Sequence, residues 1–60
     1  MIECAIKSNT FGSMDRIYLE GWLIANNIQY RLGKYGNWLA WLTFDQMYEL
    51  QSEGWVVFAL

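Results

Sequence analysis

The stretch YGNWLAWLTF, residues 35–44, places large apolar side chains at neighbouring positions and contains no charged residue. Successive side chains of a β-strand point to opposite faces, so Trp38 and Leu42 would face one way and Trp41 the other. A chain of 60 residues forms one core, because a domain of this size buries only about 60% of the surface that its unfolded chain exposes. Both faces of this strand therefore cannot lie in the core, and parity alone does not decide which tryptophan faces outward.

The excess of apolar residues extends over the whole chain. Hydrophobic residues make up 55% and aromatic residues 18% of the sequence, whereas globular domains are typically about 45–50% apolar. Since a small domain has little interior, part of this excess must lie on the surface or against a partner. Large exposed apolar patches usually mark interaction sites, so we expect self-association or binding to another molecule.

The first half of the chain predicts a strand followed by a helix. Residues 2–7 alternate cleanly, with Ile2, Cys4 and Ile6 on one face, which is typical of a half-buried strand. Ser13 is a suitable N-cap for a helix over residues 14–25. Two asparagines follow this helix, and Asn tolerates the left-handed conformation found at helix ends.

The second half predicts a hairpin, a helix and a final strand. Strand alternation resumes at residues 28–32 and passes through the glycine-bounded turn GKYGN into the apolar stretch. Thr43 then has the position of an N-cap and Gln46 that of its capping-box partner, so a helix is expected over residues 44–52. Gly54 suits the end of this helix in a Schellman motif. The last residues, WVVFAL, favour a buried strand, because they are rich in β-branched and aromatic side chains.

The resulting order is strand, helix, strand, strand, helix, strand, in a single domain over residues 1–60. This is the split βαβ arrangement of ferredoxin-like folds, an α+β class. Right-handed crossovers would pack both helices on one face of a four-stranded antiparallel sheet, with the first and third strands central. The other sheet face would stay open. Such a fold does not determine a function, because folds of this kind host unrelated activities.

The first predicted helix is apolar on two sides. At about 100° per residue, one side gathers Met14, Ile17, Tyr18, Gly21, Ile24 and Ala25, and we expect this side to face the core. Leu19 and Leu23 lie almost opposite, with Trp22 on a flank. Because aromatic anchors are favoured at binding hot spots, the expected partner-binding residues are Leu19, Trp22 and Leu23 on this helix, and Trp38 or Trp41 on the apolar strand.

The sequence offers little catalytic chemistry. It has no histidine and one cysteine, so neither a histidine-assisted nucleophile nor a zinc site can be assembled. We expect Cys4 to be a buried apolar residue, and we expect no enzymatic activity, cofactor or metal. Asp45, Glu49 and Glu53 project from one side of the second helix. They form either an ordinary solvated face or a docking surface for a basic partner.

The charge and the cysteine content restrict the expected binding partners and the expected cellular compartment of the protein. The formal net charge is −2, and Lys and Arg do not cluster, so nucleic-acid binding is disfavoured. The longest apolar run has six residues, whereas a membrane span needs about 20. A lone cysteine argues for a reducing compartment, because small secreted domains are usually rich in disulfides. We expect a cytoplasmic protein without a membrane span.

These features favour a small non-enzymatic protein-binding module. Its apolar surface would serve a homodimer, a foreign protein, or both. A compact protein of this kind suits an inhibitor or regulator from a phage or mobile element that blocks a host enzyme or defence complex by covering a surface. The alternatives are a small-molecule-sensing domain, in which subunits enclose a ligand, and a nucleic-acid-binding domain that stacks bases on the sheet.

Overall fold

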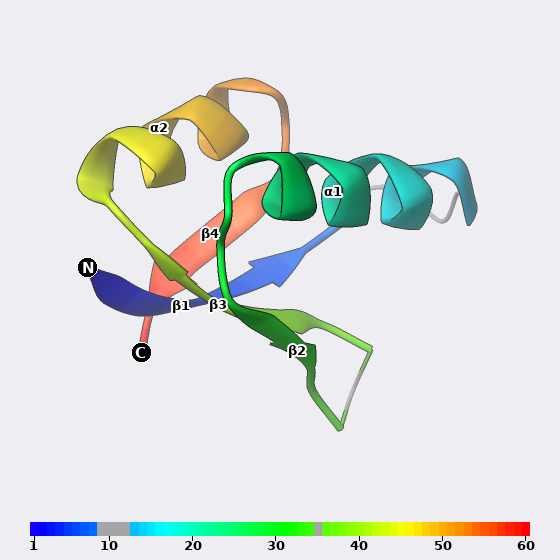
Figure 1. Cartoon of the computed structure of the whole chain (residues 1–60), viewed down its shortest axis with the longest axis horizontal. Helices are drawn as coiled ribbons and strands as arrows, with labels where there is room; N and C mark the ends of the chain where they lie inside the picture. Colours follow the sequence, from blue (N-terminus) through cyan, green and yellow to red (C-terminus); the bar gives the residue numbers. More distant parts are fainter. Residues whose placement is uncertain (9–12, 35) are drawn as a thin grey trace.

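The computed structural model describes residues 1–8, 13–34 and 36–60, with the backbone alone for residues 13–15. The four strands form one antiparallel sheet in the order β2-β3-β1-β4, and both helices cover the same face of it (Figure 1). The compact ferredoxin-like fold and the central position of the first and third strands are confirmed. The elements are β1 (Ile2–Lys7), α1 (Ser13–Ala25), β2 (Tyr30–Leu32), β3 (Trp38–Leu42), α2 (Phe44–Ser52) and β4 (Val56–Ala59).

The register of the sheet separates a core face from an open face. Ile6 lies directly opposite Trp38 on β3 and Val57 on β4, and Cys4 lies opposite Ala40. All five of these residues are buried. Since side chains alternate along a strand, the residues between them point away from the helices. The alternation that predicted β1 therefore sets which residues face the core across the whole sheet.

Both helices end in the same hydrogen-bonded motif. In α1 the N–H of Asn27 donates to the Ile24 carbonyl (3.1 Å) and that of Ile28 to the Leu23 carbonyl (3.0 Å). In α2 the same pattern joins Gly54 to Gln51 and Trp55 to Leu50, each at 3.1 Å. Asn27 has φ 55° and Gly54 has φ 98°, so both take the left-handed conformation of a Schellman motif. The predicted helix exits are confirmed.

The start of α2 is also confirmed. The hydroxyl of Thr43 accepts a hydrogen bond from the backbone N–H of Gln46 (3.2 Å), while the Thr43 N–H donates to the side-chain oxygen of Gln46 (2.9 Å). These two bonds make the capping box expected from the sequence. The helix α1 begins at Ser13, one residue before the prediction. The N-cap role predicted for the Ser13 side chain lies outside the described residues.

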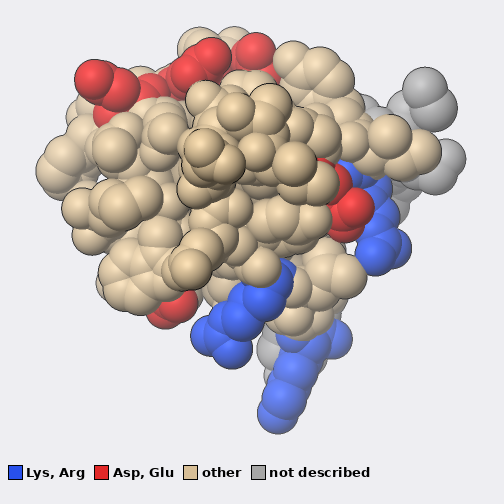
Figure 2. All heavy atoms as spheres, in the orientation of Figure 1, with Lys and Arg blue, Asp and Glu red and all other residues tan. Residues whose placement is uncertain are grey.

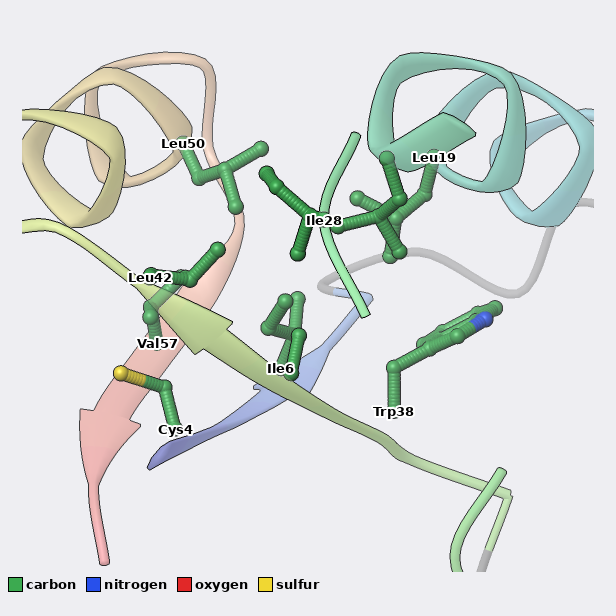
Figure 3. Packing of buried hydrophobic residues seen from close by; sticks show 10 residues of the cluster. Cys4, Ile6, Leu19, Ile28, Trp38, Leu42, Leu50 and Val57 are labelled. Carbon is green, nitrogen blue, oxygen red and sulfur yellow. The ribbon is translucent and has the colours of Figure 1, made fainter. Parts of the chain in front are cut away.

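The core lies between the helices and the sheet. Leu19 of α1 and Leu50 of α2 point toward Ile28, which follows α1 and lies above the central strands (Figure 3). The predicted second strand is shorter than expected, because β2 starts at Tyr30 and Ile28 is used as a core residue. No polar or charged residue is buried among the described residues. The core cluster consists of Cys4, Ile6, Leu19, Leu23, Ile28, Trp38, Ala40, Leu42, Leu50 and Val57.

The predicted core face of α1 is wrong. Leu19 and Leu23 are both 0% exposed, whereas Ile17, Tyr18 and Ile24 are between 56% and 68% exposed. The side we expected to be buried is centred on Gly21, and a glycine cannot fill the space between a helix and a sheet. Leucines one turn apart do fill it, so they point inward and the glycine-centred side faces solvent.

Candidate functional site: the open face of the sheet

The face of the sheet that no helix covers carries a continuous set of side chains from all four strands. Its middle row runs from Arg31 on β2 through Leu39 and Ala5 to Phe58 on β4, with each residue opposite the next. On one side of this row Trp41 lies opposite Glu3, and on the other Lys7 lies opposite Val56. We call this surface the sheet face and define it as Glu3, Ala5, Lys7, Arg31, Leu39, Trp41, Val56 and Phe58.

The structure resolves which tryptophan faces outward. Trp41 is 44% exposed on the sheet face, whereas Trp38 is 5% exposed in the core. The ring of Trp38 lies edge-on to that of Trp55, with centroids 6.1 Å apart and planes at 88°. Its Nε1 has no hydrogen-bond partner among the described residues. The expectation that Trp38 offers a partner-binding surface is therefore wrong, and Trp41 is the outward residue of the pair.

Of the three contact residues predicted on α1, none is freely exposed. Leu19 and Leu23 belong to the core cluster, and Trp22 is partly buried and packs against it. The predicted first-helix surface is therefore wrong for both leucines. Their inward orientation follows from the reversed helix face described above.

Apolar side chains make up the centre of the sheet face. Phe58 is 44% exposed and Leu39 is half-buried. Ala5 is only 3% exposed although no helix lies over it, because Leu39 and Phe58 flank it on the neighbouring strands. The face thus has a shallow apolar centre between larger side chains, with Trp41 beside it.

Three charged residues surround this centre. Arg31 and Glu3 approach to 3.9 Å, with the Arg31 side chain 70% exposed. The Lys7 ammonium lies 5.9 Å from the centroid of the Phe58 ring, which places it in range of a cation–π contact. Because surface ion pairs of this kind contribute little to stability, all three charges are available for contacts outside the chain.

A shallow hollow of about 380 Å³ opens beside Trp41. Polar and apolar groups converge on it, since Glu3, Gln29 and Arg31 line it together with Tyr30, Leu39 and Trp41. Gln29 reaches this position because its carbonyl accepts a hydrogen bond from the Trp41 backbone N–H (3.3 Å). The hollow is therefore part of the sheet face and extends it toward the β2 edge.

The sequence indicated only part of this site. Phe58 and Val56 were assigned to a buried strand because WVVFAL is apolar throughout. The sequence does not show which strand pairs with β4. Because β4 pairs with β1, the register places both residues on the open face. The odd spacing of Trp38 and Trp41 predicted that one of them faces outward, and only the structure shows that it is Trp41.

The helix layer carries a second apolar surface. Ile17, Tyr18 and Ile24 are exposed on the outer side of α1 around Gly21, where an added Cβ would meet no described atom within 4 Å. Arg16 and Glu20 form an ion pair at 3.3 Å on the flank of this side. We call Ile17, Tyr18, Gly21 and Ile24 the α1 outer stripe.

The predicted acidic face of α2 is exposed. Asp45, Glu49 and Glu53 all face solvent, and Figure 2 shows acidic atoms along the α2 side of the molecule, with basic atoms on the opposite side, near the β2 hairpin. Two exposed aromatic residues, Phe44 and Tyr48, lie on the same helix. Its use as a docking surface stays a prediction.

Cys4 does not provide a reactive group. Its side chain is 0% exposed, and its S–H donates to the Ile2 carbonyl at 3.4 Å. Burial raises the pKa of the Cys4 thiol, and the neighbouring Glu3 carboxylate raises it further. Since the thiolate is the reactive form, this thiol is poorly suited to nucleophilic chemistry.

Among residues 1–8, 13–34 and 36–60, no group of three or more acidic or cysteine side chains is placed to hold a metal ion. Within the same ranges, neither helix has the length and apolar character to cross a membrane. No protein-family model, curated protein or solved structure matches the chain. The function must therefore be inferred from the surfaces themselves.

Proposed function

We propose that the protein is a small non-enzymatic binding module that contacts other proteins through the sheet face, with Trp41 as its anchor. The observation that carries this proposal is the exposed Trp41 beside a continuous apolar row on a sheet face that no helix covers. A tryptophan exposed in this way gives a large contact area with few torsions to fix, which is why Trp is enriched at binding hot spots.

The surroundings of Trp41 suit an interface. Leu39, Ala5 and Phe58 provide the apolar centre that excludes water, while Glu3, Lys7 and Arg31 provide a polar rim. This combination of an apolar centre and a charged rim is characteristic of protein interfaces. The rim carries two positive charges against one negative charge, so it favours a partner surface with carboxylates.

The same rim argues against nucleic acid as the main partner. Glu3 lies directly opposite Trp41, where a stacked base would bring its phosphate close to a carboxylate. The chain as a whole has a net charge of −2, and phosphate backbones require clustered positive charge. We therefore favour a protein partner in the cytoplasm, which the module would inhibit or regulate by covering part of its surface.

The proposal is tested with a Trp41→Ser variant and a Tyr48→Ser control. Tyr48 is an exposed aromatic residue in the helix layer, 66% exposed against 44% for Trp41. Each tagged protein is used to recover partners from a lysate of the cells that encode it, and the recovered protein is then purified and titrated by calorimetry. Loss of a hot-spot tryptophan costs about 2 kcal/mol or more, so Trp41→Ser should weaken binding about 30-fold.

Binding by Tyr48→Ser should match that of the original protein. If the purified partner bound Trp41→Ser as tightly as the original chain, the sheet face would not be the contact surface. Equal weakening by both variants would point to a general loss of structure, which far-UV circular dichroism of each variant checks directly.

Small-molecule binding is a second candidate, favoured by the hollow beside Trp41. An arginine, a carboxylate and an amide converge there on an aromatic wall, which is the mixture of polar and apolar groups found in ligand sites. A ligand with its own carboxylate would pair with Arg31. Titration of carboxylate compounds, followed by NMR shifts of the Trp41 indole, tests this candidate, and shifts that persist in Arg31→Gln would contradict it.

A further inference from the structure

We propose that the sheet face pairs with the sheet face of a second copy of this chain, about a two-fold axis that crosses β1 at Ala5. The inference rests on the proposed function in one respect, that the sheet face is a protein contact. It goes further by naming the occupant of that face and the arrangement of the two copies.

The area that a stable dimer must bury favours an interface that covers a whole face of the sheet. A standard interface buries about 800 Å² on each partner, and the chain exposes 4257 Å² in total. A stable dimer therefore needs about a fifth of this surface. The open side of the four-stranded sheet is a single broad surface with an apolar centre, and it is not interrupted by a helix (Figure 1).

The charges on β1 select the direction of the axis. Glu3 and Lys7 lie two positions before and two positions after Ala5, on the same face of a central strand. An axis in the interface plane and perpendicular to the strands reverses the strand direction between the copies. Glu3 of each copy then lies over the partner's Lys7, which gives two symmetric contacts between opposite charges near the centre of the interface.

The other in-plane axis, parallel to the strands, is disfavoured by the same residues. It would place Glu3 over the partner's Trp41 and Arg31 over the partner's Phe58, because β1 and β3 exchange places and so do β2 and β4. The contact of Arg31 with Phe58 is tolerable as a cation–π contact, but the Glu3 carboxylate would be desolvated against an aromatic ring with no opposite charge from the other copy. Burial of an unpaired charge is strongly unfavourable.

The apolar row completes the contact. With the perpendicular axis, Leu39, Ala5 and Phe58 pack against the same three residues of the second copy. Facing sheets lie about 10 Å apart and cross at about 30°, so edge strands diverge from each other. Arg31 lies on edge strand β2 with its side chain 70% exposed. At this edge it can turn toward solvent and so avoid the equivalent arginine of the second copy.

Charge reversal tests this arrangement by sedimentation equilibrium. Glu3→Lys gives a chain with two lysines at these positions, and Lys7→Glu gives a chain with two glutamates. Each variant alone places like charges opposite each other at both contacts, so its dimer should be weakened about a hundredfold. An equimolar mixture of the two variants restores both contacts between opposite charges, so the mixture should dimerise like the original chain.

The mixture isolates the contact between copies. Glu3→Lys also removes the approach of Glu3 to Arg31 within the chain, but that loss persists in the mixture and cannot explain recovery. Asp45→Lys is the matched control, because it makes the same charge reversal on exposed α2 and should leave the dimer unchanged. Near-UV circular dichroism verifies that each variant is folded.

The proposal is overturned if the original chain stays monomeric up to about 100 µM, if either variant alone dimerises as tightly as the original, or if the mixture does not dimerise. These outcomes are distinct from failure of the proposed function. If the chain is monomeric and Trp41→Ser no longer binds the purified foreign partner, the proposed function stands and the proposed dimer is rejected. If the chain dimerises but binds no foreign protein, the pairing of the two sheet faces stands and the binding of a foreign partner is rejected.

Discussion

Trp38 and Trp41 differ in environment because they are an odd number of positions apart in one strand. Trp38 packs edge-on against Trp55 and is almost completely buried, while Trp41 lies on the sheet face. The Nε1 of Trp38 has no hydrogen-bond partner among the residues that the structure describes, so the stabilisation from its burial comes from apolar packing. The two residues should therefore respond very differently to truncation.

We predict that Trp38→Ala loses about 3–5 kcal/mol of unfolding free energy, because it leaves a cavity in the core. A domain of this size has a total stability of only a few kcal/mol, so this variant should be largely unfolded. Trp41→Ser, measured by urea unfolding of the dilute monomer, should change stability by no more than about 0.5 kcal/mol. Similar losses for the two variants would contradict the assignment of the faces.

We predict that the buried Cys4 thiol makes the free energy of unfolding depend on pH. Burial raises its folded-state pKa above the ordinary value of a free cysteine thiol, and the neighbouring Glu3 carboxylate raises it further. The folded state thus holds the thiol proton more tightly than the unfolded state does. The stabilisation is complete below the unfolded pKa and is lost as the pH rises through the folded pKa.

The urea midpoint of the original chain should consequently fall more steeply than that of Cys4→Ala, which lacks the titrating thiol, as the pH rises above the unfolded thiol pKa of about 8.5. All other ionisable groups are present in both proteins, so the comparison isolates the thiol. Parallel pH profiles for the two proteins would show that the thiol makes no contribution.

At the scale of elements, local signals located the helix ends, and they did not orient α1. The capping box at Thr43 and the left-handed residues Asn27 and Gly54 were readable because each depends on a few neighbouring residues. The buried face of α1 depends on the sheet below it, and both of its sides are apolar. Leu23 was therefore placed outside and Ile24 inside, the reverse of the structure.

On the sheet face, too, some residues can be assigned from the local sequence and others cannot. Alternation within β3 puts Trp38 and Trp41 on opposite faces, so the sequence narrowed the outward residue to one of these two without selecting it. Phe58 could not be assigned to this face, because nothing local to WVVFAL shows which parity faces the helices. Its side is set by the pairing of β4 with β1, a contact between the two ends of the chain.

Two glycines in different elements allow a matched prediction. An added Cβ meets no described atom within 4 Å at either Gly21 or Gly54, but only Gly54 has a positive φ, 98°. Gly21→Ala should stabilise the chain by up to about 1 kcal/mol, since glycine is unfavourable inside a helix. Gly54→Ala should destabilise it by about 1–2 kcal/mol, because an L-residue is strained in this conformation.

Urea unfolding of the two variants under identical conditions gives both values. Because an added Cβ meets no atom of the described residues at either site, a difference between the two variants reports backbone conformation. A stabilising effect of Gly54→Ala would contradict the left-handed helix end, and a destabilising effect of Gly21→Ala would show that the α1 outer stripe is packed against something in solution.

At the scale of the whole molecule, the fold packs a core between the helices and the sheet and still leaves eleven large apolar residues exposed among those that the structure describes. Six of them lie on two opposite outer surfaces: Trp41, Val56 and Phe58 on the sheet face, and Ile17, Tyr18 and Ile24 on α1. The helices can shield only one side of the sheet, so the shape of the fold itself separates these surfaces. A dimer through the sheet face would leave the α1 outer stripe free for a different protein.

Pairing of two sheet faces also links stability to concentration. A second copy that binds only the folded chain shifts the equilibrium away from the unfolded state. Above the dimer Kd, each tenfold increase in protein concentration should add about 1.4 kcal/mol per dimer to the free energy of unfolding. The urea midpoint of the original chain should therefore rise with concentration, while that of Glu3→Lys stays constant and that of its equimolar mixture with Lys7→Glu rises again. A midpoint of the original chain that does not move over a hundredfold range of concentration, about 1 to 100 µM, would show that the fold is stable without its second copy.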